Sequence, residues 1–529
     1  MTDTAAEPLI PETHHHEDHR RPSSDSAADF AIDENSLIAP GAFIWGLTIS
    51  AGVSDLSNRP LTTLDKSLIT SCTSFFALLA SPLTGILADT YGRKTVILAA
   101  DILFVVGALW QACTSSVAGM IAGRSIVGAA VGSASFVVPL YISEVAPSPF
   151  RGRLVTVSSL FITAGQVVAY VIGWVFSAQA GGWRWIVGLG ALPAAVQFCM
   201  LFAMPETPRY LVKVGRREKA RQVLKRVYGD GEGIEGLVTQ VLRRVEKEIL
   251  EEEDISRSSS SSTAEKNTWK AKLARINDTF THLTSVEGNR RALVIACMLQ
   301  GFQQLCGFNS LMYFSATIFH LVGFTSPTLT SLSIALTNFL FTLLAFHAID
   351  RIGRRRILLL SLPIMALGLA LCAIAFHYVD MPTLSKSQPR DTNTNTTTTT
   401  TTTLWPLTLL TAMTIYVASY AVGLGNVPWQ QSELFPLSVR SLGSALATAT
   451  NWASNTLVGL TFLPMMEFGT PAGTFALYAG VCAVAWGCVW GVYPETAGLG
   501  LEDVGGLLAE GWGVEESVRG FRARRGRGG

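Results

Sequence analysis

Long apolar segments are the feature of this sequence that most limits its fold. A helix needs about 20 mostly apolar residues to cross a bilayer. Twelve segments have this character: residues 37–53, 67–87, 95–115, 119–139, 155–177, 183–203, 292–312, 328–349, 357–378, 404–425, 442–463 and 474–493. Hydrophobic residues make up 49% of the chain and charged residues 15%, a balance that suits lipid. The sequence therefore predicts an all-α membrane protein with twelve spanning helices.

Polar segments divide the chain into five parts. We expect a disordered tail at 1–36, a six-helix half at 37–204, an insert with amphipathic helices at 205–289, a second six-helix half at 290–494 and a tail at 495–529. Lys and Arg gather in the insert and in the loops on the same side of the membrane. The positive-inside rule therefore places the insert and both termini in the cytosol. We expect a multi-pass protein of the plasma membrane.

Charge and cysteine usage argue against several other classes of protein. The formal net charge of +1 provides no field that would attract nucleic acid. The eight cysteines lie inside apolar runs, without the spacing of a disulfide framework or a metal site. No nucleophile, base and orienting group occur together, so we expect neither an enzyme nor a cofactor. Asn395 fits the N-glycosylation pattern, although its threonine-rich loop also reads as low-complexity sequence.

Three motifs occur once in each half. Asp89–Lys94 is echoed by Asp350–Arg355, Ser143–Pro147 by Ser432–Pro436, and Pro205–Thr207 by Pro494–Thr496. The spacing between the second and third motifs is the same in both halves. Parallel half-repeats with a substrate site between them are the plan of major facilitator transporters. The pattern predicts that fold, with two six-helix pseudo-repeats.

Each repeated motif brings acids and arginines together at helix ends. In a low dielectric such pairs bind strongly and are costly to separate. We expect them to act as a latch between the halves, closed when the substrate site faces outward and broken when it faces inward. Its residues are Asp89, Arg93, Glu144, Arg151, Glu206, Arg209, Asp350, Arg354, Glu433 and Arg440. The alternative is ordinary placement of charged side chains at the membrane interface.

The motifs resemble those of the sugar-porter family of the major facilitator superfamily, over roughly residues 60–505. The matching segments are Gly85–Lys94, Pro205–Arg209 and Gln303–Asn309. Within that family, Gly425–Pro436 and Ala447–Trp452 look like the fungal myo-inositol/proton symporters. The resemblance implies secondary transport of a small neutral polyol or sugar across a lipid bilayer, with protons as the coupled ion.

Uncharged amides and an aromatic ring in the expected helices fit the chemistry of a polyol. Hydroxyl groups that leave water need fixed donors and acceptors without a full charge. The candidates are Gln166, Gln303, Gln304, Asn309, Asn338, Trp429 and Asn451, and all fall where the resemblance places sugar contacts. Amides that only join helices to one another are the alternative. Gly425 and Pro428 should interrupt the tenth helix. Tyr313 either gates the outer side of the substrate site or is a packing or lipid-facing tyrosine.

The first helix departs from the family pattern. Proton-coupled members carry an aspartate in this helix, which the sequence lacks, and residues 37–53 span only about 25 Å of a hydrocarbon core of roughly 30 Å. The resemblance matches Arg124 to the arginine that pairs with that aspartate, and Asp55 and Asp101 are the nearest acids. We expect weak proton coupling and a truncated first helix. Either the sequence is a mis-spliced form, or it is a natural form with altered coupling.

Three functions remain open from the sequence. The leading one is secondary transport of myo-inositol or a similar polyol. The second is a hexose or other polyol facilitator or symporter. The third is a nutrient sensor that keeps the fold but moves no cargo.

Overall fold

The computed structural model describes an all-helical chain. The described residues are 61–147, 151–177, 179, 181–228, 234–258, 269–324, 326–378, 404–436, 439–497, 499 and 501–527. The first helices are α3 (Thr63–Tyr91), α4 (Arg93–Cys113), α5 (Val117–Val145), α6 (Arg151–Phe176), α7 (Gly182–Leu189) and α8 (Ala191–Leu201). The insert forms α9 (Pro208–Lys213), α10 (Arg217–Tyr228), α11 (Ile234–Ser258) and α12 (Trp269–Ser285). The later helices are α13 (Glu287–Leu305), α14 (Phe308–Val322), α15 (Pro327–Ile352), α16 (Arg354–Tyr378), α17 (Leu404–Val422), the 3-10 helix η1 (Val427–Leu434), α18 (Arg440–Phe468), α19 (Pro471–Val492), α20 (Leu501–Glu510) and α21 (Val514–Arg527). No strand occurs among these residues, which confirms the all-α prediction.

Ten helical stretches of the described chain are long and apolar enough to cross a membrane. They account for ten of the twelve expected spans. The first expected span, residues 37–53, lies outside the described residues, as do Asp55 and Asn395. The expected span 442–463 lies within α18, which is long enough but is not among the ten. We attribute this to the Ser, Thr and Asn residues along α18, which lower its hydropathy.

Two expected helices are broken by glycine. The segment expected to be continuous at 292–312 is divided into α13 and α14 at Gly307, whose φ is +85°. A Cβ at Gly307 would lie 2.9 Å from the ring of Tyr478, so the position requires glycine both for its backbone and for its space. The segment 183–203 is divided into α7 and α8 at Gly190. The expected interruption near Pro428 is confirmed, since α17 ends at Val422 and η1 follows.

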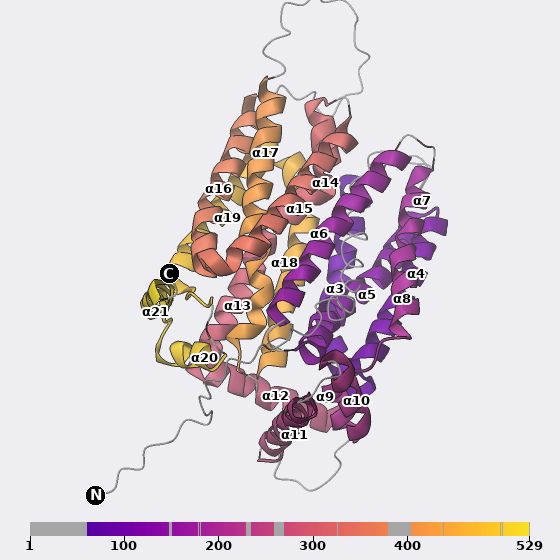
Figure 1. Ribbon diagram of the computed structural model, residues 1–529. Coiled ribbons are helices and arrows are strands. Elements are labelled where there is room, and N and C mark those ends of the chain that lie inside the picture. Colours follow the sequence, from indigo (N-terminus) through magenta and orange to yellow (C-terminus); the bar gives the residue numbers. More distant parts are fainter. Residues whose placement is uncertain are drawn as a thin grey trace, which may run out of the picture.

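The membrane helices form two groups (Figure 1). Helices α3–α8 make the N-terminal group and α13–α19 the C-terminal group. The groups meet where α3 packs against α18 and α6 packs against α15. The approach of α3 to α18 is close, because a Cβ at Gly459 would lie 3.4 Å from the Cβ of Ser71. These two pairs of helices make the main contacts between the groups, and hydrogen bonds also join Tyr170 on α6 to α14 and Trp452 on α18 to Ser135 on α5.

Helices α9–α12 lie together at one end of the bundle, which we call the insert end (Figure 1). Helices α9, α10 and α11 share a small apolar core that includes Leu211, Leu224 and Leu242. Helix α20 is held to α13 by Arg291, whose Nη1 donates to the carbonyl oxygens of Leu508 and Ala509 at 2.8 and 3.0 Å. The chain beyond α19 is thus anchored to the C-terminal group.

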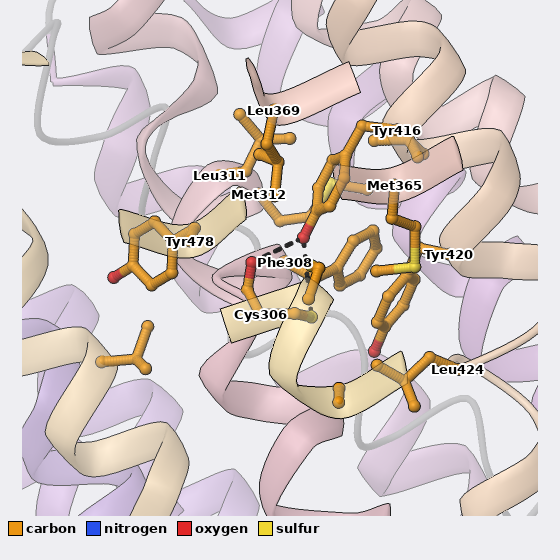
Figure 2. Close-up of a cluster of buried hydrophobic side chains, with 14 of the residues drawn as sticks. Cys306, Phe308, Leu311, Met312, Met365, Leu369, Tyr416, Tyr420, Leu424 and Tyr478 are labelled. Carbon is orange, nitrogen blue, oxygen red and sulfur yellow. Dashed lines mark hydrogen bonds between the residues drawn. The ribbon is translucent and has the colours of Figure 1, made fainter. Parts of the chain in front are cut away.

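The largest apolar core lies mainly in the C-terminal group and surrounds the break between α13 and α14. Figure 2 shows this break, where the hydroxyl of Tyr416 donates to the carbonyl oxygen of Cys306 at 2.9 Å. The ring of Phe308, directly after the break, stacks on Tyr420 with ring centroids 3.7 Å apart. Packing from α17 and α19 therefore fixes where the helix is interrupted.

Candidate functional site

A network of amide side chains lies between α13, α14 and α18. Asn451 on α18 donates from Nδ2 to the Oε1 atoms of Gln300 at 2.6 Å and Gln303 at 2.8 Å. Its Oδ1 accepts from Nε2 of Gln304 at 3.1 Å, and Oε1 of Gln304 in turn accepts from Asn309. Asn451 and the three glutamines are buried. The structure therefore brings together four of the amides expected to bind substrate: Gln303, Gln304, Asn309 and Asn451.

The same glutamines hold the interrupted tenth helix. Nε2 of Gln303 donates to the carbonyl oxygens of Leu424 and Gly425, at 3.2 and 3.0 Å. Nε2 of Gln300 donates to the carbonyl oxygen of Pro428 at 3.0 Å. Carbonyl groups freed by a broken helix must find donors when they are buried. The amides thus tie the break between α17 and η1 to the network.

The remaining expected residues lie in separate places. Asn338 on α15 donates to Oε1 of Gln166 on α6 at 2.8 Å, which joins the two groups of helices. Tyr313 on α14 is buried, and its hydroxyl accepts from Asn455 at 3.4 Å. Trp429 lies in η1, but its side chain is outside the described residues.

Gln300 and Asn455 were missed by the sequence analysis. Both are buried amides bonded to expected site residues. Helical spacing was the available signal, because Gln300 precedes Gln303 by three residues and Asn455 follows Asn451 by four. Residues with these spacings share one face of a helix.

Arg124 lies on α5 inside the bundle, with 1% of its surface exposed. Its guanidinium lies in the neighbourhood of Cys72 on α3 and Tyr313 on α14. An arginine buried within a membrane helix usually has a functional role. Its environment links the N-terminal group to α14 of the C-terminal group.

An acid–arginine cluster at the insert end of the N-terminal group surrounds the turn between α3 and α4. Arg93 Nη2 lies 3.0 Å from Oδ1 of Asp89 and 2.9 Å from Oε1 of Glu144. Glu206 accepts from the backbone N–H groups of Arg93 and Lys94, at 3.1 and 3.2 Å. Burial raises the pKa of Glu206, and the N–H donors of Thr207, Lys94 and Arg93 oppose that shift.

The corresponding cluster in the C-terminal group surrounds the turn between α15 and α16. Arg354 pairs with Glu433. Glu495 accepts from the backbone N–H groups of Arg354 at 2.9 Å and Arg355 at 3.1 Å. Gly92 and Gly353 occupy equivalent positions in the two turns, with φ values of +95° and +101°. The same types of contact thus occur at the α3–α4 turn and at the α15–α16 turn.

None of the described ion pairs of these clusters joins the N-terminal group to the C-terminal group, although Asp89 also lies 4.0 Å from Lys213 on α9. Arg93 pairs with residues of α3 and α5, and Arg354 pairs with a residue of η1. The side chains of Arg151 and Asp350 lie outside the described residues. Arg440 donates from Nε to the carbonyl oxygen of Phe435, and Arg209 lies just after the start of α9. The expected latch between the two halves stays a prediction.

Comparison with known proteins places the chain in a family. The "Sugar (and other) transporter" family model matches residues 13–507. The chain belongs to this family. The chain is 40% identical over 514 residues to myo-inositol transporter 1 of Cryptococcus neoformans var. grubii. The match covers 92% of this chain and 85% of that protein. The chain is 42% identical over 474 residues to myo-inositol transporter 1 of Candida albicans, covering 89% and 80%.

Solved structures show the same fold as this sugar transporter. The major facilitator proton:xylose symporter XylE, bound to 6-bromo-6-deoxy-D-glucose, aligns with a TM-score of 0.70 at 22% identity, covering 92% of this chain and 98% of that one. A partially occluded, inward-open form of XylE from E. coli aligns with the same TM-score at 23% identity, covering 90% and 99%. The chain is therefore a multi-pass membrane transporter of sugars or polyols with the major facilitator fold.

Proposed function

We propose that this sugar transporter carries myo-inositol or a similar small polyol. The observation that carries this proposal is the buried amide network of Gln300, Gln303, Gln304, Asn309 and Asn451. It offers donors and acceptors without a full charge, which is what a ring of hydroxyl groups needs when it leaves water. The names of the relatives at about 40% identity support the same cargo.

Transport would proceed by alternating access between the N-terminal and C-terminal groups. Gln166, Asn338 and Trp429 would complete the substrate site, and Tyr313 would close its outer side. The insert end would face the cytosol of a plasma membrane transporter, with both termini inside. The acid–arginine clusters would stabilise the helix ends that move during closure.

Proton coupling through Arg124 belongs to the same proposal. The buried arginine requires negative charge or polar neighbours. Binding and release of a proton near Arg124 would be linked to substrate transport. We expect coupling in this chain to be weak, because residues 37–53 lack the aspartate that the family resemblance implies.

Uptake of labelled myo-inositol by cells that lack their own carrier tests the proposal. The chain should be compared with a version whose first helix is lengthened by the corresponding residues of a relative, each with and without a proton uncoupler. We expect uptake that is strongest in the lengthened form and sensitive to the uncoupler. Surface labelling controls for expression. If both forms reach the surface and neither moves labelled myo-inositol while a labelled hexose is taken up, the cargo is a hexose instead.

A further inference from the structure

A carboxyl group lies in the interior of the N-terminal group, away from the amide network. Asp101 is near the middle of α4, and only 2% of its surface is exposed. Its Oδ2 atom is buried without a hydrogen-bond partner among the described residues. An ionised carboxylate at membrane depth without a partner is costly, and acidic residues at such positions usually have a function.

An amide side chain in the same region also has no hydrogen-bond partner among the described residues. Gln197 lies on α8 with 3% of its surface exposed. Its Nε2 and Oε1 are both buried, and neither has a partner in the described part of the chain. A buried amide therefore needs one acceptor and one donor from its surroundings.

Contacts between α4 and the α7–α8 pair place Asp101 and Gln197 at the same level of two neighbouring helices. Lys94 Nζ donates to the carbonyl oxygen of Met204 at 2.6 Å, and a Cβ at Gly188 would lie 3.7 Å from the Cβ of Ala112. Early residues of α4 thus meet late residues of α8, so the two helices are antiparallel. Asp101 follows Lys94 by seven residues, or about two turns, and therefore lies on the same face of α4.

Asp101 and Gln197 also lie at the same height along the axes of α4 and α8. Phe104 on α4 and Ala194 on α8 belong to one buried cluster. Asp101 precedes Phe104 by three residues and Gln197 follows Ala194 by three. In antiparallel helices both steps lead toward the same end of the bundle, here the insert end, by about 4.5 Å.

We propose that Asp101 and Gln197 form a proton-binding site between α4 and α8. Asp101 holds the proton. The two side chains are not bonded to each other in the structure, and a change of rotamer would let the carboxyl O–H of Asp101 donate to Oε1 of Gln197. Nε2 of Gln197 donates in return to the other carboxyl oxygen. A carboxylate would leave Oε1 of Gln197 without a donor, whereas the neutral acid satisfies both side chains with two hydrogen bonds.

No described cation faces Asp101 that would take the place of the proton. The charged or titratable residues on the helices packed against α4 are Asp65, Lys66, Cys72, Asp89 and Tyr91 on α3, Arg124, Tyr141 and Glu144 on α5, Arg184 on α7 and Cys199 on α8. On α4 itself, Arg93 pairs with Asp89 and Glu144, and Lys94 is bound to backbone carbonyl groups. Cys199 lies within one turn of Gln197, but its side chain is exposed. The clusters on either side of the pair are apolar.

Proton occupancy is thereby linked to helix packing. Loss of the proton puts a charge into an apolar contact, which water or a separation of α4 from α8 must relieve. The site is independent of the cargo, so it stands whether the transported molecule is a polyol or a hexose.

Infrared spectroscopy of the full chain in lipid vesicles tests the proton directly. We expect the carbonyl band of a protonated carboxyl group to persist in the wild-type protein from acidic to neutral pH, while the bands of exposed carboxyl groups disappear. Asp101→Asn, which preserves shape and hydrogen bonding, should abolish the persisting band. Glu515→Gln, which alters an exposed carboxyl on α21, should leave it unchanged. A wild-type spectrum without a persisting band, or an Asp101→Asn spectrum that retains it, overturns the proposal.

Gln197→Leu tests the pairing. Removal of the hydrogen-bond partner should shift the frequency of the Asp101 band and lower the melting temperature, and the double variant Asp101→Leu/Gln197→Leu should recover part of that loss. A band that stays in place in Gln197→Leu would overturn the assignment of Gln197 as the partner.

Discussion

At the scale of single residues, the candidate substrate site already satisfies its own hydrogen bonds. Asn451 alone bonds to Gln300, Gln303 and Gln304. If the substrate binds here, its hydroxyl groups would replace hydrogen bonds within the network, because the network has few unused donors and acceptors. Such a site would be selective, since a ligand that breaks a hydrogen bond between amides without replacing it leaves a buried polar atom unpaired.

Replacement of Asn451 should have a large effect on uptake. Asn451→Ala leaves two glutamine oxygens and one glutamine nitrogen without their partner, at a cost of about 1–3 kcal/mol for each buried group. We expect uptake at low myo-inositol concentration to fall at least about tenfold. Asn277→Ala, which removes an exposed amide on α12, is the matched control and should behave as wild type. Unchanged uptake by Asn451→Ala would show that the amide network does not bind the substrate.

The glycines of the two helix-end turns should tolerate no side chain. A Cβ at Gly92 would lie 2.5 Å from Oε2 of Glu206, and a Cβ at Gly353 would lie 2.5 Å from Oε2 of Glu495. Gly215 also has a positive φ but nothing within 4 Å, so Gly215→Ala should cost only backbone strain, about 1–2 kcal/mol. We expect Gly92→Ala and Gly353→Ala to lower the melting temperature in detergent further than Gly215→Ala. Equal shifts in all three variants would mean that the carboxylates move aside freely.

At the scale of elements, α14 is bounded by a glycine at each end. Gly307 begins it with φ +85° and Gly323 ends it with φ +92°. The two turns differ in their surroundings, because a Cβ at Gly307 would meet Tyr478 and a Cβ at Gly323 would meet nothing within 4 Å. The position of α14 relative to α13 therefore depends on the first glycine.

Alanine at these two glycines provides a matched pair of variants. Gly307→Ala must displace α14 from α19, and with it Asn309 and Tyr313, so we expect a severe loss of uptake with normal surface labelling. Gly323→Ala adds backbone strain of about 1–2 kcal/mol without a clash, and should retain most uptake. Similar uptake by both variants would contradict a role for the Gly307 break in placing the site.

At the scale of the whole molecule, two pairs of helices make the main contacts between the two groups. The contacts of α3 with α18 and of α6 with α15 connect them, and the hydrogen bond from Asn338 to Gln166 lies in the second contact. Alternating access rocks one group against the other and so changes the contacts between them. A covalent bond across the first contact should therefore stop transport.

Ser71→Cys/Gly459→Cys tests this expectation. The Cβ separation of 3.4 Å is close to the 3.8 Å or so that a disulfide prefers. We expect oxidation to abolish uptake and a reducing agent to restore it. Ala112→Cys/Gly188→Cys, with a Cβ separation of 3.7 Å inside the N-terminal group, should form a disulfide and keep its uptake. Transport by the oxidised Ser71/Gly459 variant would mean that α3 and α18 move together.

The sequence by itself determined the all-α membrane fold, because the apolar segments have the length that a bilayer requires. It also identified the interruption near Pro428 and the acids and arginines of the two helix ends, since each depends on residues that are close in the chain. Four amides of the network were found from their residue type and the family resemblance. These features are local, and local spacing is what a sequence displays.

Tertiary structure decided which side chains meet. The break at Gly307 depends on Tyr478, more than 170 residues later in the chain. Gln300 and Asn455 gained their roles from partners on other helices, and the ion pairs of Arg93 and Arg354 proved to lie within each group. Asp101 and Gln197 lie at the same level only because α4 and α8 are antiparallel in one particular register. Contacts of this kind depend on how helices pack, and the spacing of residues along a single helix does not specify them.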